Sequence, residues 1–400
     1  MNDRLHPPGL PPKVLMVAGE VSGDLQGAHL ARALLALCPD LGLIGAGGEQ
    51  MRAAGVDLRF ETTKFASVGF LEPLRVIWPL QKLLRQIHTL IDLETPRLAI
   101  LIDHYGFNMA LARFLRRRGI PVVYYFPPQI WIGGHLFAAS VAKRTDLIIS
   151  AFAKEAQVYS SYNGRAIYLG HPLVDIVKGD EDPSLAPSCT GMDPRERLIA
   201  VMPGSRTQEV ESLAAPMFGA ARIIQGRYPN ARFILPLAAE YLRPAVQREL
   251  DRAGVTRYFR IITEDVYACL SRCDLVLTTS GTSTLEATLL ELPMVVAYRV
   301  MPLSAWLARR LALTRFIALP NVLLNEEIVP ELVQGDVTAE NLADAGLNIL
   351  ESPARVRSMR MRMREVRGML GTDGVIERVA ATVLKEAGLT STTGLVGAAL

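Results

Sequence analysis

The chain has 400 residues, of which 50% are hydrophobic and 21% are charged, and its formal net charge is +3 at pH 7. This length is sufficient for two α/β domains, and this composition excludes an intrinsically disordered chain. So small a net charge does not predict a nucleic-acid partner. The basic residues are unevenly placed, however, and one cluster consists of Arg113, Arg116, Arg117 and Arg118.

The four cysteines and the distribution of apolar residues predict a cytosolic protein. The cysteines show no paired spacing that is typical of a metal site, so we expect reduced thiols. Residues 1–12 lack the apolar core of a signal peptide. No run reaches the roughly 18 to 20 apolar residues of a membrane span. Any membrane contact is therefore expected to be peripheral.

Short aliphatic and β-branched runs alternate with helical patterns along most of the chain, which is typical of parallel sheets built from βαβ units. We therefore predict an α/β protein whose first doubly wound, Rossmann-like domain covers residues 13–177. Its candidate strands are residues 14–18, 43–45, 98–102, 122–126, 147–150 and 166–169.

A polar segment rich in Pro, Gly and Asp, residues 178–195, is predicted to link this domain to a second one. We expect the second Rossmann-like domain, residues 196–340, to face the first across a cleft. Residues 341–388 are helical in pattern and are expected to pack back toward the first domain, and residues 389–400 are expected to form a flexible tail. The candidate strands of the second domain are residues 198–202, 233–237, 259–262, 275–277 and 294–297.

Ligands of open α/β sheets bind at the carboxyl ends of the strands, and the first strand ends in Ala18-Gly19-Glu20-Val21-Ser22-Gly23-Asp24. Gly19 and Gly23 let backbone N–H groups approach a phosphate or an acceptor, while Ser22 or Asp24 can cap the following helix. A purely structural turn is the alternative for this pattern.

Asp103 directly follows the apolar run 98–102, so its carboxylate is expected at the same edge. Desolvation by Tyr105 and Phe107 predicts a raised pKa and a role as general base on a hydroxyl. A helix cap or a loop brace is the alternative. His171 lies where the first domain meets the linker, and it either donates to a phosphate or sugar or serves as a hinge histidine.

The second domain carries two loops that are typical of a nucleotide site. In Pro203-Gly204-Ser205-Arg206, the guanidinium of Arg206 can bind a diphosphate by two parallel hydrogen bonds. In Ser280-Gly281-Thr282, a small-residue turn precedes a helix whose amides can bind phosphate, and Glu286 can accept both ribose hydroxyls. Asn321 offers an amide to the cleft or caps a helix.

The two nucleotide loops carry neither a Walker lysine nor an Asp-x-Asp pattern, so we expect no obligatory metal and no cofactor. Two amphipathic stretches favour contact with an anionic lipid surface. Residues 69–90 carry Trp78 among basic residues, although a helix that covers a core is the usual explanation. Residues 299–316 carry Trp306, Arg309 and Arg310.

Taken together, these motifs resemble the lipid-A-disaccharide synthase family, glycosyltransferases of family 19 with the two-domain GT-B fold. The matching blocks are collinear and span residues 14 to about 332. They are Ala18-Gly19-Glu20-x-Ser22-Gly23-Asp24, Gly45-x-Gly47-Gly48-x-x-Met51-x-x-x-Gly55, Ile102-Asp103 with Phe107-Asn108, Gly170-His171-Pro172, Pro203-Gly204-Ser205-Arg206-x-x-Glu209-Val210-Glu211, Ser280-Gly281-Thr282-x-x-Leu285-Glu286, and Tyr298-Arg299 through Trp306-Leu307-Ala308 to Leu319-Pro320-Asn321.

The resemblance implies transfer of diacylglucosamine from UDP-2,3-diacylglucosamine to 2,3-diacylglucosamine 1-phosphate, with inversion and release of UDP. It implies that Asp103 is the general base, and that the donor is bound by Ser205, Arg206, Ser280, Gly281, Thr282, Glu286 and Asn321. It also implies a UDP-acylglucosamine donor, a lipid monosaccharide 1-phosphate acceptor and a peripheral location on the inner face of the cytoplasmic membrane. A homodimer is one possibility.

Two positions depart from the family pattern. Gly106 stands where the family usually has a second Asp, and Ile132-Gly133-Gly134 replaces an expected tryptophan and basic residues. A related UDP-sugar:lipid glycosyltransferase with a different acceptor is therefore one alternative, and a non-catalytic, membrane-associated paralogue is another.

Overall fold

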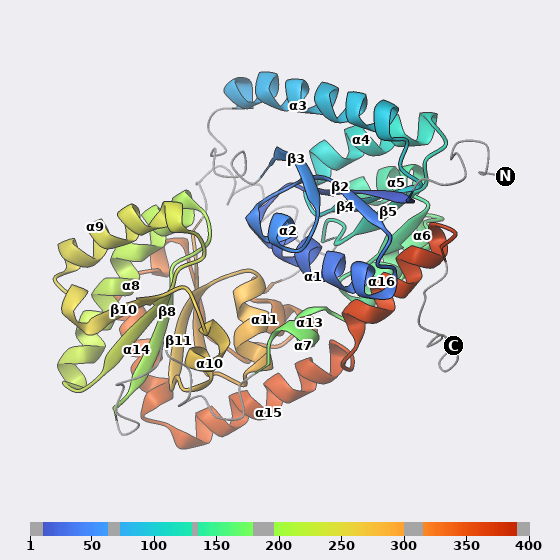
Figure 1. Ribbon diagram of the computed structural model, residues 1–400. Helices are drawn as coiled ribbons and strands as arrows, with labels where there is room; N and C mark the ends of the chain where they lie inside the picture. Colours follow the sequence, from blue (N-terminus) through green and yellow to red (C-terminus); the bar gives the residue numbers. More distant parts are fainter. Residues whose placement is uncertain (1–10, 63–72, 130–134, 179–195, 300–314, 390–400) are drawn as a thin grey trace. The chain divides into compact units, whose positions relative to one another are not determined.

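The computed structural model describes residues 11–62, 73–129, 135–178, 196–299 and 315–389 (Figure 1). The chain divides into two compact units, of which the first comprises Met1–Pro172 together with Thr372–Leu400 and the second Leu173–Gly371. Within the described ranges, none of the helices combines the length and the apolar character needed to cross a bilayer.

A seven-stranded parallel sheet forms the centre of the first unit, in the order β3-β2-β1-β4-β5-β6-β7. The strand order reverses at β1, from which the sheet grows in both directions, as in a doubly wound fold. The strands are β1 (Lys13–Ala18), β2 (Gly42–Gly47), β3 (Asp57–Glu61), β4 (Leu98–Ile102), β5 (Val122–Tyr125), β6 (Leu147–Ile149) and β7 (Ala166–Ile167).

Both faces of this sheet are covered, which explains its continuous apolar strands. Alternate residues of β1 enter two separate cores, Val14 and Met16 on one face and Leu15 and Val17 on the other. Helices α1 and α16 cover the first face and α3, α4 and α5 the second. The helices of the unit are α1 (Val21–Leu37), α2 (Glu49–Ala53), α3 (Pro73–Glu94), α4 (Tyr105–Arg117), α5 (His135–Arg144), α6 (Ala153–Ser161) and α16 (Val375–Glu386).

The second unit is built on a six-stranded parallel sheet in the order β10-β9-β8-β11-β12-β13. Its strands are β8 (Leu198–Met202), β9 (Arg232–Pro236), β10 (Phe259–Ile262), β11 (Leu275–Thr279), β12 (Met294–Tyr298) and β13 (Glu331–Val333). Its helices are α7 (Leu173–Ile176), α8 (Thr207–Arg227), α9 (Arg243–Ala253), α10 (Val266–Ser271), α11 (Thr282–Leu289), α13 (Leu319–Leu324), α14 (Ala339–Leu350) and α15 (Pro353–Met369), with short 3-10 turns η4 (Glu240–Leu242), η5 (Thr256–Tyr258) and η6 (Gln334–Asp336).

All eleven predicted strands are present, and the prediction of two doubly wound α/β domains is confirmed. Two strands are additional, and both lie at sheet edges. Asp57–Glu61 alternates polar and apolar residues because an edge strand faces water, and Glu331–Val333 is too short to give a pattern.

Cys38 and Cys273 are free thiols, whereas Cys269 is in a disulfide, so the expectation of reduced cysteines is wrong for that residue. Spacing alone does not reveal which thiols meet in space.

The C-terminal helices are shared between the units, in contrast to the expectation that residues 341–388 all pack toward the first domain. Helix α14 packs on α8 and α15 on α11, both in the second unit. Only α16 packs in the first unit, where Figure 1 shows it beside α1. An ion pair between Arg165 and Glu386 at 2.7 Å fastens this last helix. Most of the expected linker, residues 178–195, and of the expected tail lies outside the described residues.

Candidate active site

The candidate base, Asp103, lies at the carboxyl end of β4 in an unusual backbone conformation. Its φ angle is 56° and that of His104 is 31°, so two consecutive non-glycine residues occupy the left-handed region. Such residues each cost of order 1–3 kcal/mol and persist only where neighbouring groups fix them. The structure therefore holds Asp103 in place at an energetic cost.

Buried donors and acceptors on two elements, β5 and α4, fix this conformation. The Asp103 amide donates to the carbonyl of Tyr125 at 3.1 Å. The Asp103 carbonyl accepts from Asn108 Nδ2 and from the Tyr124 hydroxyl, both at 2.7 Å. Asn108 and Tyr124 are fully buried, and burial holds the pKa of Tyr124 well above its usual value. The tyrosine therefore stays protonated and continues to donate.

Each oxygen of the Asp103 carboxylate accepts a hydrogen bond. The amide of His104 donates to Oδ1 at 2.9 Å and the Ser22 hydroxyl to Oδ2 at 3.3 Å. A Cβ on Gly19 would lie 2.5 Å from that of His104, so only glycine permits this approach. The structure thus brings Gly19, Ser22 and Asp103 together, and Gly23 lies against the Asp103 side chain.

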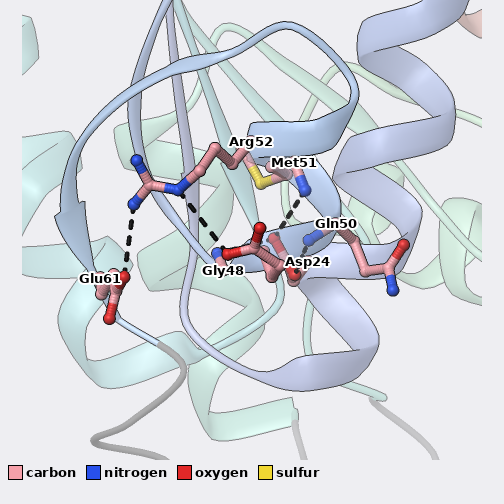
Figure 2. A network of polar contacts seen from close by, with 7 residues as sticks. Asp24, Gly48, Gln50, Met51, Arg52 and Glu61 are labelled. Carbon is pink, nitrogen blue, oxygen red and sulfur yellow. Dashed lines mark hydrogen bonds and ion pairs between the residues drawn. The ribbon is translucent and has the colours of Figure 1, made fainter.

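Asp24 connects the start of α1 to the loop after β2 (Figure 2). Its buried carboxylate accepts from the amides of Gly48 at 2.7 Å, Gln50 at 3.0 Å and Met51 at 3.2 Å. The sequence predicted that Ser22 or Asp24 caps its own helix, but neither side chain caps α1, and Asp24 caps α2 instead. Burial raises the pKa of Asp24, and the three amide donors oppose that shift.

His171 lies buried at the end of the first unit, 3% exposed, between the rings of Phe126 and Phe152. Burial lowers its pKa to about 3, so the imidazole is neutral at pH 7. Its predicted contact with a phosphate or sugar stays a prediction.

In the second unit, the loop after β8 is closed by its own helix. Gly204 has φ 134°, and the amides of Ser205 and Arg206 donate to Glu209 Oε2 at 2.8 and 3.2 Å. The Arg206 guanidinium lies 3.7 Å from the same carboxylate, and its side chain is 54% exposed. The exposed guanidinium, rather than these two amides, is therefore the group that is accessible to a diphosphate.

The second predicted loop leads from β11 into α11. Gly281 has φ 143°, which favours glycine, and Thr282 is the first residue of the helix. Glu286, one turn later, accepts from the Tyr267 hydroxyl at 3.3 Å. Burial raises the pKa of Glu286 to about 6. This arrangement supplies amides for phosphate and a carboxylate for hydroxyl groups.

Four other predicted residues lie elsewhere or outside the described residues. Trp78 belongs to α3, whereas Trp306, Arg309 and Arg310 fall in residues 300–314, which the structure does not describe. In the described part of the chain, no group of three or more His, Cys, Asp or Glu side chains is arranged to hold a metal ion.

Sequence reasoning missed the roles of Tyr124, Asn108 and Tyr267. Tyr124 lies in a strand that reads as plain apolar core, and Tyr267 is 19 residues from Glu286. Asn108 follows Asp103 by five residues in the motif, and that spacing was the one available signal.

The chain is similar to known proteins along nearly its whole length. A family model described as lipid-A-disaccharide synthetase matches residues 14–381. Lipid-A-disaccharide synthase of Geobacter sulfurreducens is 36% identical over 377 residues, covering 94% of this chain and 97% of that protein. The same enzyme of Neisseria meningitidis serogroup A is 34% identical over 379 residues, covering 94% and 98%.

Solved structures with a similar fold include nucleotide-sugar enzymes. Staphylococcus aureus MnaA in a co-structure with UDP has a TM-score of 0.69 at 14% identity and covers 94% of this chain and 97% of its own. UDP-GlcNAc 2-epimerase from Neisseria meningitidis, bound to UDP-GlcNAc, has a TM-score of 0.65 at 13% identity, with coverage of 93% and 100%. These likenesses support the two-domain fold. The family match and the curated relatives go further, and by them the chain belongs to the lipid-A-disaccharide synthase family.

Proposed function

We propose that this protein condenses UDP-2,3-diacylglucosamine with 2,3-diacylglucosamine 1-phosphate to the β-1,6-linked lipid A disaccharide 1-phosphate and releases UDP. Membership of the family over residues 14–381 carries this proposal. The placement of Asp103 at a strand end supports a role as base, because the hydrogen bonds to its two carboxylate oxygens orient the group and favour its ionised form.

In the proposed reaction Asp103 removes the proton of the acceptor 6-hydroxyl. The resulting oxygen forms a bond to the anomeric carbon of the donor, and the bond from that carbon to the UDP oxygen breaks. UDP leaves with the bonding electron pair, and the configuration is inverted because the attack comes opposite the leaving group. This displacement removes one proton, so it needs one base. A positioned base typically accelerates such a reaction by about 10²–10⁴-fold.

The second unit supplies the groups that stabilise the leaving diphosphate in this proposal. The exposed guanidinium of Arg206 pairs with phosphate oxygens, and the amides of Gly281 and Thr282 at the start of α11 donate to them. Glu286 accepts the ribose hydroxyls. No metal enters the proposed mechanism, and the donor is a substrate, not a cofactor.

We further propose peripheral association with the inner membrane, because both substrates carry acyl chains. The exposed residues Arg113, Arg116 and Arg117 on α4 provide positive charge for an anionic lipid surface. Vesicles that contain anionic lipid are expected to sediment the protein at low salt and to release it at high salt. Equal binding to purely zwitterionic vesicles would refute the electrostatic part.

The reaction is tested with purified protein, both substrates and mass spectrometry of the lipid product. The wild type is expected to release UDP and form the disaccharide. Asp103→Asn should lose at least about 10²-fold in kcat while it still binds UDP. Asp57→Asn, a change of the same kind at an exposed carboxylate of the same unit, serves as control. Full activity of Asp103→Asn would exclude Asp103 as the base.

A further inference from the structure

The side-chain amide of Asn321 is fully used inside the second unit. It is completely buried, and its Nδ2 donates to the carbonyl of Val329 at 2.9 Å and to Glu331 Oε1 at 2.7 Å. Its Oδ1 accepts from the amides of Ile328 at 2.8 Å and Val329 at 3.0 Å. A primary amide has two N–H groups and two acceptor sites, so its capacity is filled. Asn321 therefore braces the fold and does not itself bind the nucleotide in this state.

Glu331, the first residue of β13, is the second half of the same brace. Its Oε2 accepts from the amide of Ile317, and its Oε1 accepts from the amide of Ala318, both at 2.9 Å. Ala318 is the N-cap of α13 and has no side chain that can cap the helix. The carboxylate of Glu331 thus accepts from the amides of the N-cap residue and of the residue before it, as the glutamate of a capping box accepts from the N-cap amide.

The braced segment is tied directly to the candidate phosphate loop. The hydroxyl of Ser280 donates to the carbonyl of Ile317 at 2.8 Å. The carbonyl of Ile317 therefore accepts from Ser280, and the amide of the same residue donates to Glu331. A Cβ on Gly281, the next residue of the loop, would have no neighbour within 4 Å, so packing does not hold that position. The Gly281 carbonyl accepts from the Thr284 hydroxyl at 2.7 Å and from the Thr284 amide at 3.1 Å, so the helix side of the loop is held by α11. The hydrogen bond from Ser280 to Ile317 holds the loop from outside that helix.

We propose that Glu331 is a positioning residue for donor binding, which holds the Ser280–Gly281–Thr282 loop in its binding shape through the Ile317 peptide. This inference rests on the proposed function of that loop. The chemistry calls for a carboxylate, because three N–H groups converge on it and it accepts without donating. A glutamine would turn an N–H group toward at least one of those donors.

The test compares full-length wild type with Glu331→Gln by calorimetric titration with UDP and by steady-state kinetics. We expect the variant to bind UDP about 3- to 10-fold more weakly, as for the loss of one or two hydrogen bonds. The KM for the donor should rise by a similar factor. The KM for the acceptor and kcat at saturating donor should stay within about twofold, because Glu331 touches neither acceptor nor reacting atoms.

Asp274→Asn is the matched control. Asp274 precedes β11 at the opposite end of the strand, where it accepts from the Leu198 amide at 3.0 Å and pairs with Arg197. This variant loses hydrogen bonds of the same kind in the same unit, so its melting temperature should fall without a change in UDP affinity. A role of Glu331 in stability alone predicts the same behaviour for Glu331→Gln and would overturn the proposal.

A double-mutant cycle with Ser280→Ala tests the connection itself. If Glu331 acts through Ser280, the effects of the two substitutions on the Kd for UDP should be clearly less than additive. Additive effects would overturn the proposal. If Glu331→Gln does not fold, Glu331→Asp, which keeps the charge but withdraws both oxygens, carries the same expectation. Failure of the wild type to bind UDP would instead refute the proposed function.

Discussion

Asp103 and Glu286 show two ways in which a single residue is prepared for its role. Asp103 is held in a left-handed conformation by partners that bind its backbone, so its position depends on Tyr124 and Asn108 more than on its own side chain. Glu286 is prepared by burial, which disfavours its ionised form. The position of Asp103 is thus fixed by its backbone conformation, whereas the pKa of Glu286 is raised by its surroundings.

The raised pKa of Glu286 predicts a pH dependence of donor use. Its pKa lies at about 6, above the usual 4.5, so as the pH falls this carboxylate is protonated before an ordinary glutamate would be. A protonated carboxyl accepts the two ribose hydroxyls poorly, and kcat/KM for the donor should therefore decline about tenfold per pH unit below about pH 6. The measurement is a profile of kcat/KM from about pH 5 to pH 8 with the nucleotide sugar. UDP itself is unsuitable because a terminal phosphate titrates near about pH 6.

Glu286→Gln should remove this acid limb and reduce kcat/KM at about pH 8 by about tenfold or more, as for lost hydrogen bonds to a charged group. A limb that persists unchanged in the variant would assign the titration to another group.

At the scale of elements, the carboxyl edge of the first sheet is assembled by α1. In the first turn of this helix, Ser22 donates a hydrogen bond to Asp103, and Asp24 accepts from the amides at the start of α2. One helical turn thus connects the loops that follow β1, β2 and β4. A substitution at Asp24 should therefore lower the stability of the protein and not only disturb the helix that it caps.

Asp24→Asn is expected to destabilise the protein by about 2–4 kcal/mol, because the new N–H group faces amide donors and leaves buried groups unsatisfied. Unfolding in urea, followed by circular dichroism, measures the loss. Glu49→Gln is the control, since Glu49 begins α2 but its side chain is 82% exposed, and it should change stability by less than about 0.5 kcal/mol. Equal losses in the two variants would contradict a special role for the buried carboxylate.

The strands were predictable from the sequence where burial on both faces left continuous apolar runs, as in Leu98–Ile102 and Leu198–Met202. Because ligands of open α/β sheets bind at the carboxyl ends of strands, these runs then predicted the positions of Asp103 and of the two loops of the second unit. Edge strand β3 was not predictable, because its alternating pattern is shared by many loops.

The braces of the site were not predictable for a different reason. Glu331 reaches the amide of Ile317, which is 14 residues away, and Tyr267 reaches Glu286 across 19 residues. Neither pair has a spacing that any local rule connects, because the fold alone brings such partners together. Asn321 was predicted as a ligand contact on its motif, whereas its hydrogen bonds favour a supporting role.

At the scale of the whole molecule, the chain passes between the two units twice. It enters the second unit after Pro172 and returns to the first at Thr372. Helix α16 then completes the core on one face of the first sheet, where Val375, Val379, Val383 and Leu384 are at most 1% exposed. Burial stabilises the fold by about 1.5–3 kcal/mol for each fully buried side chain before conformational entropy is subtracted, so losing four of them removes as much as the net roughly 5–15 kcal/mol that keeps a domain folded.

A chain that ends at Gly371 should therefore retain the second unit but lose a stable first unit. We expect a strong fall in soluble yield and loss of the disaccharide-forming activity. A chain that ends at Leu389 keeps α16 and should behave as the full-length protein. Sedimentation of cell lysates and urea unfolding compare the three chains. Normal solubility and a full unfolding transition for the shorter chain would show that α16 is dispensable.

The return of α16 to the first unit also sets an order of events during synthesis. A ribosome makes α1 early and α16 only after the entire second unit, so the apolar face that they share stays uncovered for most of translation. A chain cut short by a premature stop never covers that face and remains a substrate for chaperones and proteases. The first unit therefore becomes stable only after translation has passed α16.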